Sequence, residues 1–176
     1  GRLSNADWPK LAQASNEIAQ MPLRVLDSPG WKMSQIIRQA HAWHRIGLDI
    51  LLLDYLQRVR PDMKTDRHDL AIGQMAMDCK TLAATLKIPV VLFSQLSRKV
   101  EDRADKRPNL SDLRESGQIE QEADNVVFLY RDAVYNDSAD EREAELIVEK
   151  QRQGPTGIIP MLWEGDRSLW LDDKDS

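Results

Sequence analysis

Two short apolar runs end in side chains that could bind a nucleotide. The run "ILLLD" ends in Asp54, and the run "VVLFSQ" ends in Ser94 and Gln95. Such runs are typical of buried parallel strands, and open α/β sheets bind ligands beyond the carboxyl ends of their strands. An Asp there can hold Mg²⁺ through water, and a Gln can orient a water or sense a γ-phosphate. These residues alone leave two alternatives open, that Asp54 only caps a turn and that Gln95 is an ordinary strand terminus.

A third candidate is an anion-binding loop in "LSDLRESGQIEQEAD". Arg114 offers a planar fork of donors for phosphate oxygens. Gly117, which has no Cβ, would let backbone N–H groups approach an anion closely. The alternative is a surface turn in which Ser116 caps the short helix that follows.

Two cations, Lys150 and Arg152, follow the apolar run "AELIV" in the stretch "EKQRQGPTG". Side chains alternate between the faces of a strand, so the pattern predicts that both cations share a face with Leu146 and Val148. Fully burying unpaired cations is costly. Either the strand has left the core by Lys150, or an anion meets the two cations. In the second case they could reach another subunit's ligand, as arginine fingers do.

Three further residues have weaker claims to chemistry. His41 and His44 have a spacing on one helix that could suit a metal, but no third ligand is obvious in the sequence. Cys79 falls within the apolar stripe of a predicted helix, which indicates a buried structural thiol rather than a nucleophile. The phosphate-loop pattern G-x-x-x-x-G-K-[ST] does not occur in the sequence.

The elements that must position these residues alternate between helices and strands. Helices are predicted over residues 7–20, 33–47 and 69–87, the last with an apolar stripe at Ile72, Met75, Cys79, Leu82 and Leu86. Strands are predicted over residues 22–27, 49–54, 88–94 and 125–130, followed by 144–151, 156–163 and 168–171. The charged stretch 98–109 is predicted to be mobile. This order favours an α/β fold, with a mainly parallel sheet flanked by helices and an antiparallel strand pair at the carboxyl end.

The composition suits one globular domain of 176 residues, with 41% hydrophobic and 30% charged residues. A net charge of −5 does not indicate nucleic-acid binding by bulk charge, although it leaves a local basic site open. One cysteine excludes an internal disulfide and fits a reducing compartment. The sequence contains no long apolar run and no visible signal peptide, so we expect no membrane partner.

In this order, "LLLDYLQ", "PVVLFSQLSRKVEDRADKRPNLSDLRESGQIEQEADNVVFLYRD" and "EKQRQGPTG" resemble the carboxyl-terminal motor domain of DnaB-type replicative DNA helicases. The preceding "DWPKLAQASNEIAQMPLRVLDSPGWKMSQIIRQA" resembles the same domain, so the resemblance covers essentially the whole chain. It implies a RecA-like ATPase core in a homo-hexameric ring around single-stranded DNA. The implied cofactors are ATP and Mg²⁺, and the implied location is the cytoplasm of a bacterial or phage-infected cell.

The resemblance also implies roles for the candidate nucleotide residues. Asp54 matches the acidic residue that organises Mg²⁺, and Gln95 matches the Gln that links the γ-phosphate state to the DNA-facing side. Lys150 and Arg152 match the pair that reaches a neighbour's ATP, with Arg152 as the finger. The family's "KHRNG" reads "KQRQG" here, and both cations survive that change.

For DNA, the resemblance implies that Arg114, Glu115 and Gly117 hold the strand's backbone inside the ring. In the family, the phosphate-binding loop, the glutamate base and the primase-recruiting domain lie upstream of the matched region. We therefore expect residues 1–176 to be a partial domain, truncated at its amino end, that is inactive in isolation. Primase and a helicase loader are expected to bind outside this chain.

The sequence leaves two alternatives to a helicase motor open. One is a RecA-like recombination ATPase of RadA type, which would share the fold and the strand-end Asp. The other is a non-catalytic fragment that only binds DNA or another subunit. The runs "SDLRESGQIEQEAD" and "KQRQGPTG" favour the helicase.

Overall fold

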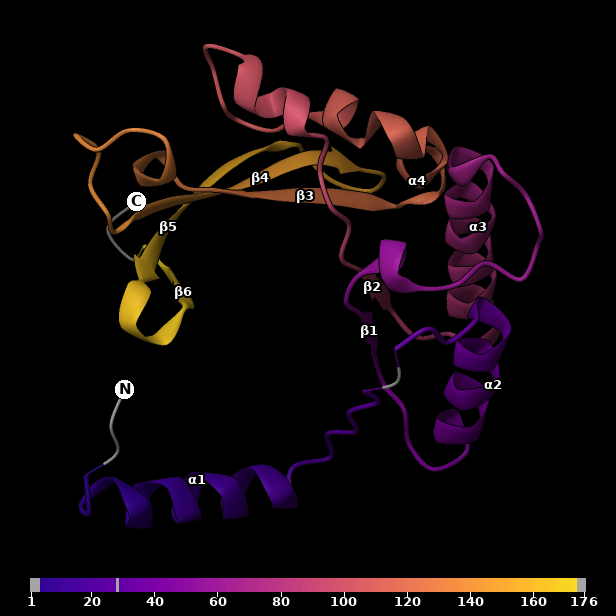
Figure 1. Cartoon of the computed structure of the whole chain (residues 1–176), viewed down its shortest axis with the longest axis horizontal. Helices are drawn as coiled ribbons and strands as arrows, with labels where there is room; N and C mark the ends of the chain where they lie inside the picture. The colour runs from indigo at the N-terminus through magenta and orange to yellow at the C-terminus, as the bar shows by residue number, and fades with distance from the viewer. Residues whose placement is uncertain (1–3, 28, 174–176) are drawn as a thin grey trace.

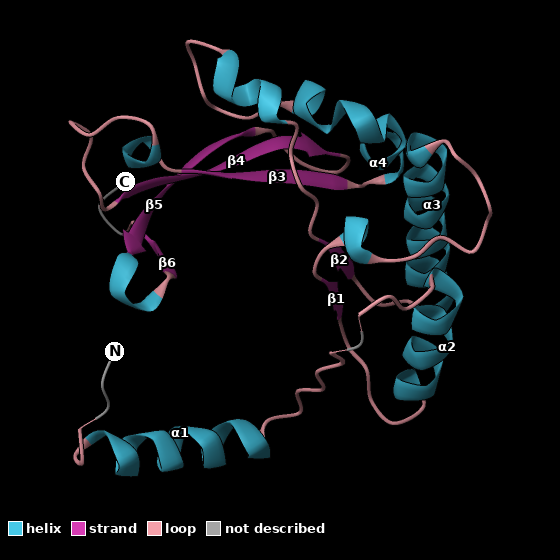
Figure 2. Ribbon diagram, viewed as in Figure 1, coloured by secondary structure: helices cyan, strands magenta, loops and turns pink. Residues whose placement is uncertain are grey.

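The computed structural model describes residues 4–27 and 29–173, with helices and strands arranged as an open frame (Figure 1). Figure 2 distinguishes the helices from the strands. The α-helices are α1 (Asp7–Gln20), α2 (Met33–His44), α3 (His68–Leu86) and α4 (Gly117–Glu122). The strands are β1 (Leu51–Leu53), β2 (Val90–Leu92), β3 (Asn125–Tyr130), β4 (Glu143–Gln151), β5 (Gly157–Glu164) and β6 (Leu169–Asp172). Short 3₁₀ helices are η1 (Leu56–Arg58), η2 (Arg98–Asp102), η3 (Leu110–Ser116), η4 (Asp132–Val134) and η5 (Gly165–Arg167).

A parallel pair, β1 and β2, packs against the helices α2 and α3. Its register aligns Leu51 with Val90 and Leu53 with Leu92. The main core cluster between these elements consists of Met33, Leu53, Leu56, Ile72, Met75, Ala76, Cys79 and Ile119. All five residues of the apolar stripe predicted for α3 are buried, so that prediction is confirmed.

The remaining strands form an antiparallel sheet in the order β3-β4-β5-β6. The helices η3 and α4 lie over one face of this sheet (Figure 1), and the cluster beneath them consists of Leu113, Val126, Phe128, Tyr130 and Ile147. The predicted α/β class is confirmed. The antiparallel part is larger than the predicted pair because it also includes β3 and β6, and among the described strands only β1 and β2 pair in parallel.

The opposite face of the strands is open. Leu52 of β1 is 54% exposed, and Val127 and Leu129 of β3 are 45% and 56% exposed. The prediction that these strands are buried on both faces is therefore wrong for the described residues. The strands β1, β2 and β3 have helices on one side only, and no described element covers their other side.

The first segment of the chain lies apart from the rest. Helix α1 has the predicted bounds, but none of its residues is buried, and Figure 1 shows it at a distance from the other helices. The predicted strand at residues 22–27 does not form. A strand is stabilised by ladder bonds to a neighbour, and no described strand pairs with this segment. No helix in the described ranges is both long and apolar enough to cross a membrane.

The charged stretch 98–109, for which the sequence predicted mobility, forms ion pairs with residues of other elements. Arg103 in this stretch pairs with Asp112 at 2.9 Å. Arg107 forms a second ion pair with Glu145 of β4 at 2.6 Å, and its guanidinium lies 4.9 Å from the centroid of the Tyr130 ring. Charge along the sequence does not reveal these pairs, because their partners come from other elements.

Candidate functional site

The parallel pairing of β1 and β2 brings two predicted site residues to the same edge of the sheet. The backbone N–H of Phe93 donates to the carbonyl of Leu53 at 3.0 Å, so the pairing continues to the ends of both strands. Asp54 follows β1 directly, and Gln95 comes shortly after β2. The side chain of Asp54 is exposed, as a residue that binds a soluble ligand requires.

A residue that sequence reasoning missed, Gln57, joins these two strand ends. Its side-chain amide nitrogen donates to the hydroxyl of Ser94 at 2.9 Å, and its side-chain oxygen accepts from the backbone N–H of Gln95 at 3.3 Å. Gln57 lies in η1, the turn that follows Asp54. In the sequence, only its place in "DYLQ", shortly after a strand-end Asp, could have indicated that Gln57 belongs to the site.

The metal-binding capacity of this edge rests on one carboxylate. Among the described residues, no group of three or more His, Cys, Asp or Glu side chains could hold a metal ion. His41 and His44 are accordingly not part of such a group. A Mg²⁺ ion beside Asp54 would need water and phosphate oxygens as its other ligands, which is a common arrangement for Mg²⁺ in phosphate-using enzymes.

The predicted face of Lys150 is wrong because β4 contains a bulge. Val127 lies opposite Val148, but Val126 lies opposite Lys150, so β4 carries one extra residue at this point. Directly opposed residues project to the same face, and an extra residue inverts the alternation beyond it. Lys150 therefore shares the face of buried Val126 and Ile147 rather than that of Leu146 and Val148.

Both cations contact the carboxyl end of α4. The Lys150 ammonium donates to the carbonyls of Glu120 at 2.5 Å and Gln121 at 3.3 Å. Arg152 donates to the same Gln121 carbonyl at 3.1 Å. The last carbonyls of a helix attract cations because they have no partner within the helix. The two predicted finger residues thus lie together, and their hydrogen bonds within the described chain lead to α4 rather than to Asp54 or Gln95.

An acidic residue next to α4 completes this arrangement. Asp124 forms an ion pair with the Arg152 guanidinium at 3.5 Å and hydrogen-bonds to the Lys80 ammonium. The Lys80 hydrogen bond is the main reason that the pKa of Asp124 lies below its ordinary value, and the charges of Arg152 and Lys150 lower it further. The carboxylate therefore stays ionised and neutralises part of the positive charge of the neighbouring Lys and Arg side chains.

The predicted DNA-contact loop is η3 together with the first residue of α4. The side chains of Arg114 and Glu115 lie outside the described part of the structure. Gly117 has a right-handed helical backbone, with φ −54° and ψ −23°. A Cβ at Gly117 would meet no atom within 4 Å. Nothing within the described chain therefore requires a glycine here, and its role toward an external ligand stays a prediction.

Asp112, which sequence reasoning also missed, fixes the start of η3. It is only 5% exposed. Its carboxylate accepts two hydrogen bonds from Arg103, at 2.9 and 3.2 Å, and one from the backbone N–H of Asn109 at 2.9 Å. Its carbonyl accepts from the backbone N–H of Ser97 at 3.1 Å. The buried charge thus has several partners, as burial of a carboxylate demands.

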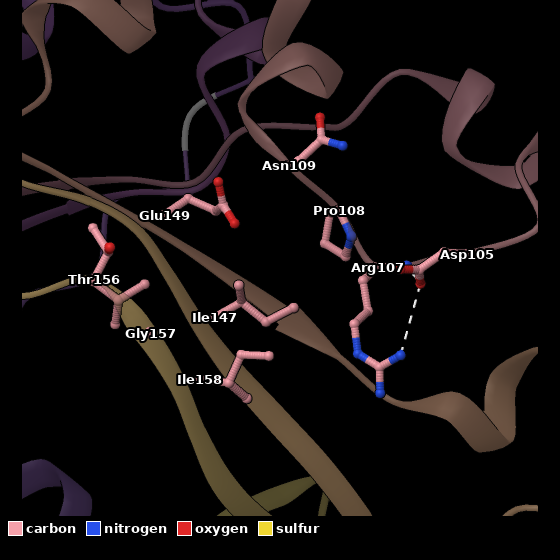
Figure 3. Close-up of a pocket in the computed structure, with 10 residues that line it drawn as sticks. Asp105, Arg107, Pro108, Asn109, Ile147, Glu149, Thr156, Gly157 and Ile158 are labelled. Atoms are coloured by element: carbon pink, nitrogen blue, oxygen red, sulfur yellow. Dashed lines mark hydrogen bonds and ion pairs between the residues drawn. The ribbon is translucent and has the colours of Figure 1, made fainter.

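Two cavities lie near these residues. One, of about 470 Å³, is lined by Gln57, His68, Ile72, Gln95, Leu96, Ser97, Arg98, Lys99, Asp112 and Leu113. The other, of about 340 Å³, lies between residues 105–109 and the β4–β5 hairpin (Figure 3). Figure 3 shows Arg107 and Asp105 on one side of it and Thr156 on the other. Its ten lining residues include none of the predicted site residues, whereas Gln95 lines the first cavity.

The family described as "DnaB-like helicase C terminal domain" matches residues 1–171. The chain belongs to this family. The replicative DNA helicase DnaB of Pasteurella multocida is 41% identical over 170 residues, which are 94% of this chain and 36% of the relative. The replicative DNA helicase DnaC of Bacillus subtilis is 38% identical over 164 residues, which are 92% of this chain and 36% of that relative. This DnaB-like chain therefore spans about a third of the length of these relatives.

Two solved structures show that the chain has the RecA-like fold of DnaB-like ATPase domains. One, described as an ATPase domain, has a TM-score of 0.91 at 36% identity, over 97% of this chain and 61% of that chain. A second, "The Structure Of A DnaB-Like Replicative Helicase And Its Interactions With Primase", has a TM-score of 0.90 at 36% identity, over 97% of this chain and 42% of that chain.

Proposed function

We propose that residues 1–176 are part of the motor domain of a hexameric replicative DNA helicase. The full protein couples ATP hydrolysis at subunit interfaces to movement along single-stranded DNA and to duplex unwinding. The observation that carries this proposal is the juxtaposition of Asp54 and Gln95 at neighbouring strand ends, bridged by Gln57, in a chain of the DnaB-like family.

ATP and Mg²⁺ are the cofactors of this site in the proposal. Asp54 holds the Mg²⁺ of bound ATP through water, and Gln95 reads the presence of the γ-phosphate. Mg²⁺ held by Asp54 would supply positive charge that offsets the negative charge of the phosphates. The exposed Asp54 carboxylate fits this use, because a Mg²⁺ ion that keeps several waters needs only one or two protein carboxylates.

Lys150 and Arg152 serve the ATP of a neighbouring subunit in this proposal. The Arg152 side chain is 53% exposed, and it contacts the Gln121 carbonyl and the exposed Asp124 carboxylate. Exposed ion pairs contribute little free energy. The guanidinium can therefore exchange these partners for a phosphate at small cost, which a finger that acts on another subunit requires.

The same proposal makes the chain a partial domain. Among the described strands, β2 pairs only with β1 and β3 pairs only with β4, so each has an unpaired edge. The apolar face of Leu52 and Leu129 is exposed as well, and a surface of that kind needs a covering partner. We propose that an upstream segment supplies this cover together with the phosphate-binding loop, in line with the greater length of the relatives.

Single-stranded DNA and five further copies of the chain are the direct partners. Arg114, Glu115 and Gly117 hold the DNA backbone in the ring channel. The DnaB-like helicase of known structure is described together with its interactions with primase, and we propose primase and a loader as partners of regions outside residues 1–176. The proposed location is the cytoplasm.

The decisive experiment compares two activities of the full-length protein. We expect ATP-dependent displacement of a strand from a forked duplex, and no strand exchange between homologous duplexes. An Asp54→Asn variant should lose strand displacement. Asp49→Asn, which changes an exposed carboxylate before the amino end of β1, should keep it. Strand exchange without displacement would favour the recombination ATPase, and neither activity would favour a non-catalytic protein.

A further inference from the structure

The charged residue Asp112 lies between the loop that carries Gln95 and the proposed DNA contacts of η3 and α4. Along the chain it comes shortly before Arg114 and Gly117, the proposed DNA contacts. In space its carbonyl accepts the backbone N–H of Ser97, which comes shortly after Gln95. A single residue therefore contacts the loop beyond β2 through its main chain and lies in the first turn of the DNA-facing helix η3.

The side chain of Asp112 determines where η3 begins. It accepts the backbone N–H of Asn109, which caps the first turn, while the Asn109 side chain accepts the backbone N–H of Ser111 at 3.0 Å. Two parallel bonds from Arg103 fix the orientation of the carboxylate, since a guanidinium fork matches both of its oxygens. Rotation of this carboxylate would break the cap and the ion pair together.

The loop beyond β2 is also held near its beginning, by a hydrogen bond to a side chain from the turn after β1. Gln57 holds the backbone N–H of Gln95. Gln57, Gln95, Ser97 and Asp112 all line the cavity of about 470 Å³. Two hydrogen bonds, joined by the backbone of residues 95–97, therefore link the turn after β1 to the first turn of η3.

We infer that Asp112 is a positioning residue, which with Arg103 holds the DNA-facing helix η3 in register with the loop of Gln95. The inference rests on the proposed function of Gln95 and η3. Because Asp112 is only 5% exposed, its side chain offers almost no surface to a nucleotide or to DNA. Asp112 transmits a displacement of the Gln95 loop to η3 because the Ser97 bond and the η3 cap meet in one buried residue.

The test measures ATP turnover by the full-length protein with and without single-stranded DNA. The ratio of the two rates should fall on the order of tenfold in Asp112→Asn, which keeps the shape of the side chain but removes the charge that orients Arg103. Arg103→Lys keeps the charge but loses the fork, and should give a smaller fall. The KM for ATP should stay within about twofold of wild type, because neither residue contacts nucleotide.

A matched control lies in the same charged stretch. Arg107 and Glu145 form a bidentate ion pair at 2.6 and 2.8 Å, which joins this stretch to β4. The Arg107 carbonyl accepts a hydrogen bond from Arg103 at 2.7 Å, and Glu145→Gln leaves that bond in place. Glu145→Gln should keep the wild-type ratio. Melting temperatures of all variants separate lost coupling from lost folding, and Arg103→Lys keeps the test decisive where Asp112→Asn does not fold.

Each outcome is distinguishable. A wild-type protein without DNA-dependent turnover overturns the proposed function itself. A functional wild type with an unchanged ratio in folded Asp112→Asn, or in folded Arg103→Lys where Asp112→Asn does not fold, overturns the positioning role alone. An equal fall in Glu145→Gln also overturns it, because any loosening of the charged stretch would then suffice.

Discussion

The side-chain oxygen of Gln57 accepts a hydrogen bond from the backbone N–H of Gln95 at 3.3 Å, across the ends of two parallel strands. The same side chain donates to the hydroxyl of Ser94 at 2.9 Å. One amide thus fixes the start of the loop that carries Gln95. The geometry of that loop depends on a residue that belongs to the turn after the other strand.

Removal of this amide should slow ATP turnover. Each of its two hydrogen bonds contributes about 1 kcal/mol, so Gln57→Ala should lower DNA-stimulated kcat of the full-length protein on the order of tenfold, with less effect on nucleotide affinity. Gln57→Glu keeps the acceptor for Gln95 and should lose less. Gln13→Ala, which removes an exposed amide bonded to Glu17 on α1, is the control and should match wild type. Equal kcat in Gln57→Ala and Gln13→Ala would contradict the prediction.

Arg152 should be required for hydrolysis but not for binding. In the full-length protein, Arg152→Ala should lower kcat on the order of 10³-fold or more, as loss of an arginine finger does. The affinity for a fluorescent ATP analogue should change little, because the Arg152 side chain serves a neighbour's nucleotide. Arg167→Ala provides a matched control, since Arg167 is 75% exposed and its ion pair with Glu164 is long, at 3.8 Å. Unchanged turnover in Arg152→Ala would remove its assignment as the finger.

The thiol of Cys79 should be inert in the folded protein. Burial raises its pKa from 9.0 to about 12, and the nearby Asp78 charge adds to the rise. The thiolate fraction at pH 8 should then be lower on the order of 10³-fold, and alkylation slower to a similar extent. Iodoacetamide labelling followed by peptide mapping, before and after denaturation, measures this. Fast labelling of the native protein would mean that this face of α3 opens.

Residues 1–176 in isolation should expose apolar surface and lack ATPase activity. The open faces at Leu52, Val91, Val127 and Leu129 predict strong binding of a hydrophobic dye and a tendency to aggregate. The full-length protein should bind little dye at the same concentration. ATP turnover by the isolated residues above that of their Asp54→Asn variant would refute the expected inactivity.

Sequence reasoning succeeded where the determining interactions are local. The stripe of α3 and the strand-end places of Asp54 and Gln95 follow from hydrophobic periodicity, which the backbone of one element determines. The bounds of α1 were also correct. These features do not depend on which other segment lies alongside.

It failed where pairing between distant segments decides the outcome. The bulge opposite Val126 depends on the register between β3 and β4, and it moved Lys150 to the other face. The contacts of Asp112 and Gln57 cross from one loop to another, so neither residue was distinguished by its spacing. The segment 22–27 has strand-like residues, but a strand also needs a neighbour.

The carbonyl of Gln121 accepts hydrogen bonds from both Lys150 and Arg152. Gln121 belongs to α4, which continues directly from η3. Any displacement of η3 that carries α4 with it would therefore move the acceptor that Lys150 and Arg152 share. In the proposed motor, a change at the DNA-contact loop would thus change the hydrogen bonding of the two cations proposed to serve the neighbouring subunit.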